Sequence, residues 1–421
     1  MRLKLHGENL TKTKDNWPLH VFFISLGSAL FGVGFAALPV LFLLGWLCCE
    51  LKRNPKELIN TIRDDRNFWI WVFYIVFLVV VFVSDIVNKS KLSNLDGILY
   101  SLAIGVFIAC GSLLSRRNNA RSVLALYSRW MTFWTVFVLS FVEFGRYKSG
   151  IFDNPNVLFS GIAMLGLLGL VFFMENKEHG NISRGISLAC WAWSFSSIIR
   201  YSTSEALLPV FIVVSLILTI LSDNSKSMVV LAVIFFCGAL YFSFNGEILK
   251  SLESVDFVSI DFWRQLLNRR ETIWTATARI ISRYPLLGIG SGKFPEISSE
   301  ILKASPDIKL GLQSYYAHSH SLWTHQMAVH GLIAGTAFIG FLLSALRCVL
   351  YSYRREKALA FPLSVLGIFS VCYVYGLVEV APLFEELIPL IWGSLGLLMG
   401  MGYTNALLYE RKGPNLVDSD E

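Results

Sequence analysis

The chain has little charge for its length. Of its 421 residues only 16% are Asp, Glu, Lys or Arg, whereas 54% are hydrophobic and the mean hydropathy is +0.57. A soluble globular domain has about a quarter of its residues charged, so that class of protein is excluded. Apolar runs of about 18 residues or more recur along the chain, and each can cross about 30 Å of hydrocarbon. The composition therefore predicts an all-α polytopic membrane protein.

The chain also lacks the short motifs of several familiar sites. Its seven cysteines show no Cys-x-x-Cys or Cys/His spacing and fall in or beside apolar runs, which indicates buried apolar side chains. The P-loop pattern G-x-x-x-x-G-K-[ST] is absent. The net charge of +6 arises mostly in a few loops between apolar runs, so it does not argue for binding to nucleic acid.

Hydropathy divides the chain into about twelve transmembrane helices. Lys- and Arg-rich loops alternate with loops that have few of these residues, which by the positive-inside rule places both termini in the cytoplasm. The long segment 245–320 then lies on the opposite side of the membrane. We expect spans near residues 18–34, 36–51, 68–86, 96–114, 122–142, 156–174, 184–200, 204–222, 228–244, 321–346, 358–380 and 387–408.

The long loop contains a stretch with helical periodicity. In "DFWRQLLNRRETIWTATARIISRYP" apolar residues recur at helical spacing with arginines between them, and Pro285 is expected to end that helix. The glycine-rich "GIGSG" that follows, residues 288–292, either turns the chain tightly or cradles a phosphate.

Arginines gather on the side of the membrane where the long loop lies. Arg146 and Arg200 stand at span ends, and Arg269 and Arg270 lie on the loop helix. Taken singly, each is explained as a solvated or snorkelling side chain. Together they suit a polyanionic ligand, because guanidinium groups match phosphate oxygens in bidentate geometry.

Four of the seven histidines lie in "AHSHSLWTHQMAVHG", at positions 318, 320, 325 and 330. No acidic residue or cysteine stands among them, and no three share one face of a helix, so we expect no metal site. His325 and His330 fall inside the following span and are predicted to be packed, neutral side chains. His318 and His320 lie at the membrane edge, where a neutral imidazole can accept a proton near pH 7.

These segments resemble the O-antigen ligase and polymerase superfamily. "RRETIW", "PLLGIGSGKF" and "HSHS" are similar to its patterns R-x-x-x-W, P-x-x-G-x-G-x-G-x-F and H-x-H-N, and "GRYKSGIFDNPNVLFSG" is similar to its upstream arginine loop. Two positions depart from the family. Ser321 stands where asparagine is usual, and Glu205 stands where an arginine is expected, five residues after Arg200.

The resemblance implies a GT-C-like helical enzyme of the bacterial inner membrane with one large, helix-containing periplasmic loop. The chain then divides into spans one to nine in residues 1–244, a periplasmic catalytic loop at 245–320, and spans ten to twelve with a cytoplasmic tail at 321–421. Such enzymes transfer a glycan from undecaprenyl diphosphate to an acceptor hydroxyl at the periplasmic face, with inversion and with no metal or cofactor. The implied partners are the lipid-linked donor, a lipid A-core acceptor and membrane lipids.

By position, the resemblance makes His320 the catalytic base and makes Arg146 and Arg270 ligands of the donor diphosphate. Arg200, Arg269 and His318 are further candidates for substrate binding.

Within this superfamily we favour a lipid A-core ligase of lipopolysaccharide biosynthesis, because a single long loop dominates. An O-antigen polymerase, which uses the same donor and a second lipid-linked glycan as acceptor, is the nearest alternative. A transporter of the same glycans should show ionisable residues near mid-membrane and repeat symmetry. Glu379, Glu385 and Glu386 stand at span ends, where they either orient an arginine or the acceptor, or are solvated carboxylates.

Overall fold

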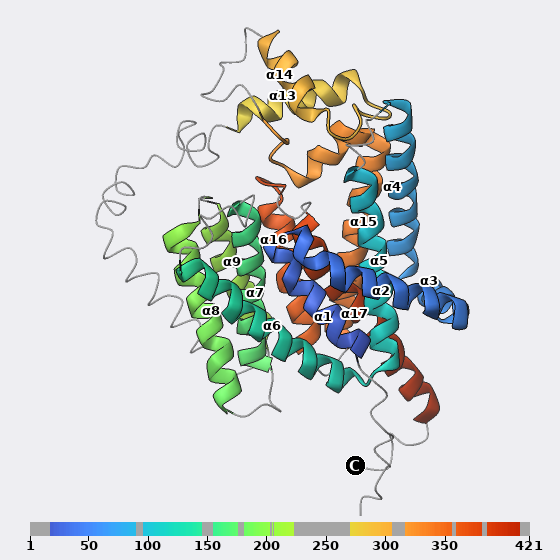
Figure 1. The fold of residues 1–421 in the computed structure, drawn as a ribbon, viewed down its shortest axis with the longest axis vertical. Helices are drawn as coiled ribbons and strands as arrows, with labels where there is room; N and C mark the ends of the chain where they lie inside the picture. The colour runs from blue at the N-terminus through green and yellow to red at the C-terminus, as the bar shows by residue number, and fades with distance from the viewer. Residues whose placement is uncertain are drawn as a thin grey trace, which may run out of the picture.

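The computed structural model describes residues 17–89, 96–144, 155–175, 181–202, 204, 206–222, 270–304, 316–355, 359–380 and 385–412. Within these ranges the chain is helical and has no strand (Figure 1). Two short 3-10 helices are η1 (Ala29–Phe31) and η5 (Glu385–Leu387). The α-helices are α1 (Trp17–Ser28), α2 (Val33–Arg53), α3 (Pro55–Arg63), α4 (Phe68–Val87), α5 (Asp96–Arg117), α6 (Ala120–Glu143), α7 (Pro155–Glu175), α8 (Asn181–Tyr201), α9 (Leu207–Leu221), α13 (Glu271–Arg283), α14 (Phe294–Lys303), α15 (Leu322–Arg355), α16 (Ala360–Tyr375) and α17 (Ile388–Lys412).

The prediction of an all-α polytopic membrane protein is confirmed. Six of the described helices are long and apolar enough to cross a membrane, and shorter apolar segments include α9 and α16. Each expected span except the ninth coincides with a described helix, and the ninth, 228–244, lies outside the described residues. The expected loop helix is present as α13, which ends at Arg283, just before Pro285. Helices α3 and α14 were not expected from the sequence.

The bundle packs around α7, which is almost entirely buried. Glycines let its neighbours approach closely: a Cβ on Gly169 would lie 2.7 Å from the carbonyl oxygen of Ser187 on α8. A glycine also allows the close contact between α5 and α17, where a Cβ on Gly396 would lie 2.5 Å from the carbonyl oxygen of Ile108. Small residues at helix contacts are typical of membrane bundles, since lipid provides no hydrophobic force between helices.

One end of the bundle collects the Lys- and Arg-rich connections. Arg117 at the end of α5 forms ion pairs with Glu50 on α2 and with Glu57 on α3. Arg66, just before α4, stacks over the ring of Tyr351 near the end of α15. The loops that the positive-inside rule assigned to one side therefore meet at one end of the structure.

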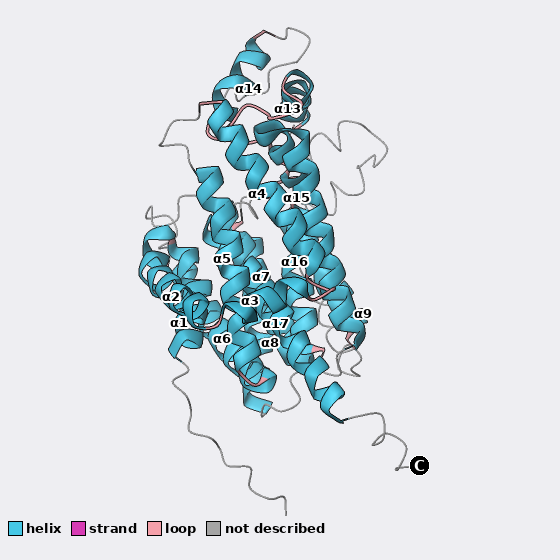
Figure 2. Cartoon of the chain, turned by 90° about the vertical axis from the view of Figure 1, so that its right-hand side faces the viewer, coloured by secondary structure: helices cyan, strands magenta, loops and turns pink. Residues whose placement is uncertain are grey.

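The opposite end carries α13 and α14, which lie above the ends of α4 and α15 (Figures 1 and 2). Helix α17 ends at the far side of the bundle from them (Figure 1). The two loop helices bury a small apolar core of their own against the first turns of α15. That core contains Ile273, Ala276, Ile280, Ile289, Phe294, Ile301, Leu302, Ala328 and Val329.

Candidate active site

The turn before α15 holds His318 and His320 in a fixed arrangement. The hydroxyl of buried Ser319 donates to the carbonyl of Ser321 at 3.0 Å, and Leu322 N donates to the carbonyl of Gly376 at 2.8 Å. The indole of Trp274 on α13 donates to the carbonyl of His320 at 3.3 Å. His320 itself has φ +51°, a left-handed conformation that is uncommon for a residue other than glycine. Bonds from α13, α16 and the turn itself thus maintain a backbone conformation that would otherwise be unfavourable.

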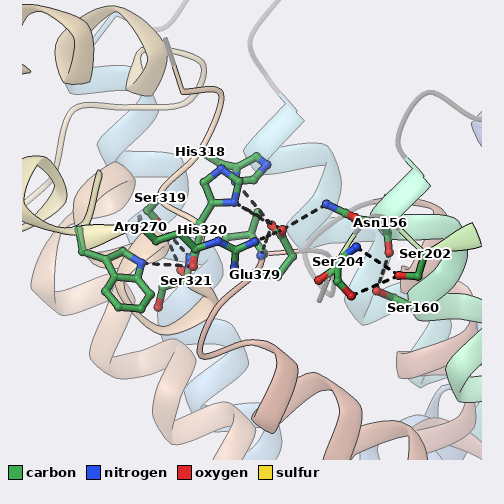
Figure 3. A network of polar contacts seen from close by, with 12 residues as sticks. Asn156, Ser160, Ser202, Ser204, Arg270, His318, Ser319, His320, Ser321 and Glu379 are labelled. Carbon is green, nitrogen blue, oxygen red and sulfur yellow. Dashed lines mark hydrogen bonds and ion pairs between the residues drawn. The ribbon is translucent and has the colours of Figure 1, made fainter. Parts of the chain in front are cut away.

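The buried carboxylate of Glu379, four residues after the end of α16, lies at the centre of the site. Its Oε2 accepts from Nη2 of Arg270 at 3.3 Å and from the amide of Asn156 at 3.4 Å. Nδ1 of His320 lies 3.4 Å from both carboxylate oxygens, and Nδ1 of His318 lies 3.8 Å from Oε1. Figure 3 shows these side chains converging on Glu379 from α7, from the residue before α13 and from the turn before α15.

The carboxylate of Glu379 is ionised at neutral pH. Burial by itself would raise the pKa of this carboxyl, but the contacts with His320, His318 and Arg270 outweigh burial and lower the pKa to about 2. The fixed negative charge holds Arg270 in place and gives the Nδ1–H of His320 an acceptor.

The two imidazole rings of the site lie close together, with their centroids 4.3 Å apart. Burial, His320 and Arg270 lower the pKa of His318 to about 4, although Glu379 acts in the opposite direction. His318 is therefore neutral near pH 7, and its ring is mostly buried. The ring of His320 is less buried, with 23% of its side chain exposed, so a substrate can reach it.

Arg270 uses only one of its two terminal nitrogens in the contact with Glu379. It directly precedes α13, and its side chain is 12% exposed. While Nη2 contacts Glu379, the buried Nη1 has no hydrogen-bond partner among the residues that the structure describes. An unsatisfied buried donor costs about 1–3 kcal/mol, so an anionic oxygen arriving beside Arg270 would be bound favourably.

The structure brings together three of the candidate substrate or catalytic residues, namely His318, His320 and Arg270, around Glu379. Of the alternatives that the sequence left open for Glu379, the structure favours the one in which it orients an arginine, because it is buried and contacts Arg270. Arg200, at the end of α8, instead forms an ion pair with Glu143 on α6 and stacks over the ring of Tyr201. Arg146, Arg269 and Glu205 lie outside the described residues. The predicted roles of the two arginines, and the effect of a glutamate at position 205 where the family has an arginine, therefore stay predictions.

Two polar residues of this end of the bundle were not predicted to act. Asn156 is the last asparagine of the segment that resembles the family's upstream arginine loop, and its amide contacts Glu379. Asp85 stands within the apolar run of α4, and an acidic residue in such a run is a sequence signal by which it could have been identified.

The glycine-rich turn binds the protein itself. Gly290 N donates to the carbonyl of Val329 at 2.8 Å, and Ser291 N donates to Asp85 at 2.8 Å. The turn fits into a break of α15 at Gly331, whose φ is +86° and where a Cβ would lie 2.1 Å from the carbonyl oxygen of Leu286. Of the two readings that the sequence left open, the structure favours the tight turn over the phosphate cradle.

Comparison with known proteins identifies one family. Residues 188–339 match the O-antigen ligase family, a stretch that runs from α8 into α15 and includes Arg270, His318 and His320. The match supports membership of the O-antigen ligase superfamily and a glycosyltransferase-like activity of the ligase or polymerase type. It also implies a lipid-linked glycan substrate. No curated protein matches the chain.

Proposed function

We propose that this chain, which carries an O-antigen ligase domain at residues 188–339, is a lipid A-core ligase of the inner membrane. It transfers a glycan from undecaprenyl diphosphate to a hydroxyl of lipid A-core at the periplasmic face. The observation that carries the proposal is the sharing of one carboxylate, Glu379, by a cationic group and a basic group, Arg270 and His320.

The cationic part of the site suits the leaving group. As the bond between the anomeric carbon and the phosphate oxygen breaks, negative charge builds up on the diphosphate. Arg270 lies next to this charge in a fixed orientation, and preorganised donors of this kind stabilise a transition state without rearranging. The diphosphate leaves with the electron pair of the broken bond and needs no general acid.

The basic part of the site suits the acceptor. When His320 donates its Nδ1–H to Glu379, its Nε2 is left with a lone pair for the proton of the acceptor hydroxyl. The hydroxyl oxygen attacks the anomeric carbon from the side opposite the diphosphate, so the configuration inverts, and the proton ends on Nε2. A positioned base of this kind contributes roughly 10²–10⁴-fold to the rate.

The remaining candidates extend the substrate site. We assign His318, beside His320, to the acceptor side, and Arg146 to the donor diphosphate on the strength of the family resemblance. Arg269, next to Arg270 in the sequence, is a further candidate for binding the same diphosphate. Arg200 would reach the donor only by releasing Glu143, to which it is now paired.

The proposal is tested with the full chain, purified and reconstituted in lipid, given an undecaprenyl-diphosphate glycan in the presence of EDTA. One reaction contains lipid A-core and a second contains only additional donor. Glycan on lipid A-core supports the ligase. Lengthened lipid-linked glycan would instead identify a polymerase, and the absence of both products in folded, monodisperse preparations would contradict glycan transfer and favour a transporter.

A further inference from the structure

The triad of His318, His320 and Glu379 has the spacing of a metal-binding site. One nitrogen from each histidine and one carboxylate oxygen all lie within 4.8 Å of one another. Oε1 of Glu379 is 3.4 Å from Nδ1 of His320 and 3.8 Å from Nδ1 of His318. In a tetrahedral zinc site, with bonds of about 2.0–2.1 Å to nitrogen and oxygen, ligand atoms are roughly 3.3–3.4 Å apart. A movement of a few tenths of an ångström would bring both of these distances to the values of a zinc site.

We infer that the triad binds a divalent transition-metal ion of the zinc type, and that the bound ion blocks glycan transfer reversibly. The inhibitory half of this inference rests on the proposed function, whereas the binding half does not. Two imidazole nitrogens and one carboxylate oxygen form a set that suits zinc and cobalt ions better than magnesium or calcium, which prefer oxygen ligands alone.

The surroundings of the triad orient its ligands. Arg270 and Asn156 hold Oε2 of Glu379, and the backbone N–H of Val380 donates to Oε1 at 2.9 Å. Hydrogen bonds of this kind to a ligating carboxylate fix its direction and support the affinity for metal. Because these contacts fix both oxygens of Glu379, binding requires little reorganisation of the carboxylate.

The charge of Arg270 limits the strength of binding. Its guanidinium lies 3.3 Å from Oε2 of Glu379 and already balances the carboxylate, so an arriving dication is only partly neutralised by the protein. This favours an ion that exchanges with solution over a permanently bound one. An anion in the open fourth position, such as hydroxide or inorganic phosphate, would supply the missing negative charge.

A bound ion would disable His320 as a base. A neutral imidazole carries a single N–H, and coordination of the ion through Nδ1 leaves that proton on Nε2. Nε2 then has no lone pair for the proton of the acceptor. The ion would also take the carboxylate oxygen that faces both histidines.

Binding is measured on the full chain purified in detergent without a histidine tag and stripped with EDTA. Titration with Co²⁺ should give the visible absorption of a tetrahedral site, and calorimetry with Zn²⁺ should give one ion per chain. His318→Gln and Glu379→Gln should each weaken binding at least about tenfold, since even changes outside the metal's own ligands cost that much. His20→Gln, a control on α1 where His20 accepts from Trp130, should bind like the wild type.

Absence of the cobalt spectrum, or binding that is unchanged in His318→Gln and Glu379→Gln, would overturn the metal site. In the transfer assay, Zn²⁺ should inhibit and EDTA should restore activity, and the residual activity of His318→Gln should need at least about tenfold more Zn²⁺. Stoichiometric binding without inhibition would refute the block alone. A chain that transfers no glycan under any condition would refute the proposed function, while the cobalt spectrum would still decide the metal site.

Discussion

Glu379 is buried at the end of an apolar helix, where an unpaired carboxylate would be costly. Its contacts with Arg270, Asn156 and the two histidines compensate for that burial. A buried ion pair is weak evidence for stability, because desolvation offsets much of the attraction. We interpret it instead as an arrangement that orients two functional groups, one just before α13 and one in the turn before α15, toward one substrate.

Replacement of His320 by alanine should stop transfer while leaving the chain in the membrane. The substitution removes the base, whose contribution is about 10²–10⁴-fold in kcat. It leaves in place the backbone hydrogen bonds that hold the turn, so the fold should persist. Transfer is measured with saturating donor and acceptor, and folding by the elution profile in detergent. Wild-type kcat in a folded His320→Ala protein would end the assignment of the base.

Arg270→Ala should impair donor use more than Arg270→Lys. Lysine keeps the charge next to Glu379 but loses the planar fork that matches a diphosphate, whereas alanine loses both. Loss of one such donor costs about 10²–10³-fold in kcat at comparable sites. Arg283→Ala, at the exposed end of the same helix, is the matched control and should be nearly normal. If both Arg270 variants had equal, near-normal kinetics, a role for Arg270 in binding the diphosphate would be excluded.

The stability of the protein should fall in acid partly through His318. Its pKa is about 4 when folded against 6.5 for the free side chain, so the unfolded chain takes up the proton first. Stability is therefore lost as pH falls from 6.5 to about 4, by about 3 kcal/mol at most. The pKa of the Glu379 carboxyl is lowered from 4.5 to about 2, so this group adds to the loss of stability only below pH 4.5. The unfolding temperature of His318→Gln should drop less between pH 7 and 5 than that of the wild type, and an identical drop would contradict the expected protonation.

At the scale of elements, the glycine-rich turn links α13, α4 and α15. Asp85 on α4 accepts from the backbone N–H of Ser291 at 2.8 Å and from its hydroxyl at 3.0 Å. Nδ1 of His330 on α15 lies 3.9 Å from the same carboxylate. The turn follows α13, which carries Trp274 beside His320, so Asp85 helps to set the position of the site without touching it.

Asp85→Ala should destabilise the protein, whereas Asp85→Asn should be milder. Alanine leaves the two donors of Ser291 without an acceptor in a buried place, at a cost of about 1–3 kcal/mol for each unsatisfied group. Asparagine keeps one oxygen for the backbone N–H. Amide hydrogen exchange across residues 285–293 should rise in the alanine variant and stay close to wild type in the asparagine variant. Equal exchange in all three proteins would show that this contact does not hold the turn.

The sequence predicted the helices well because hydropathy is a local property, and the described spans lie where the apolar runs lie. Arg270 and His320 were found through motifs. The pairing of His320 with Glu379 could not be predicted, since 59 residues separate them and a carboxylate at a span end is equally consistent with a solvated one. Nothing in the sequence around the four histidines indicates that the segment after α16 supplies an acidic residue to them.

At the scale of the whole molecule, the site lies at one end of the bundle, where α7 begins, α16 ends and α15 starts. Helix α4 leads to the same end and leaves a broad apolar face exposed. Its exposed residues are Phe68, Trp69, Ile75, Val76, Val79, Phe82, Val83, Ile86 and Val87. Such a face is suited to lipid contact. This arrangement suits the proposed lipid-linked donor, whose diphosphate would reach the site while its tail stays in the bilayer.

The end that carries the site is expected to face the periplasm. The cationic connections around Arg117 and Arg66 meet at the other end, and the positive-inside rule assigns that end to the cytoplasm. Single cysteines introduced into a cysteine-free chain test this orientation. Lys303→Cys, exposed on α14, should react with a membrane-impermeant maleimide in intact spheroplasts, whereas Lys56→Cys, exposed on α3, should react only after permeabilisation. The reverse labelling pattern would mean that the site faces the cytoplasm, where a periplasmic acceptor could not reach it. That result would contradict the proposed reaction as well as the topology.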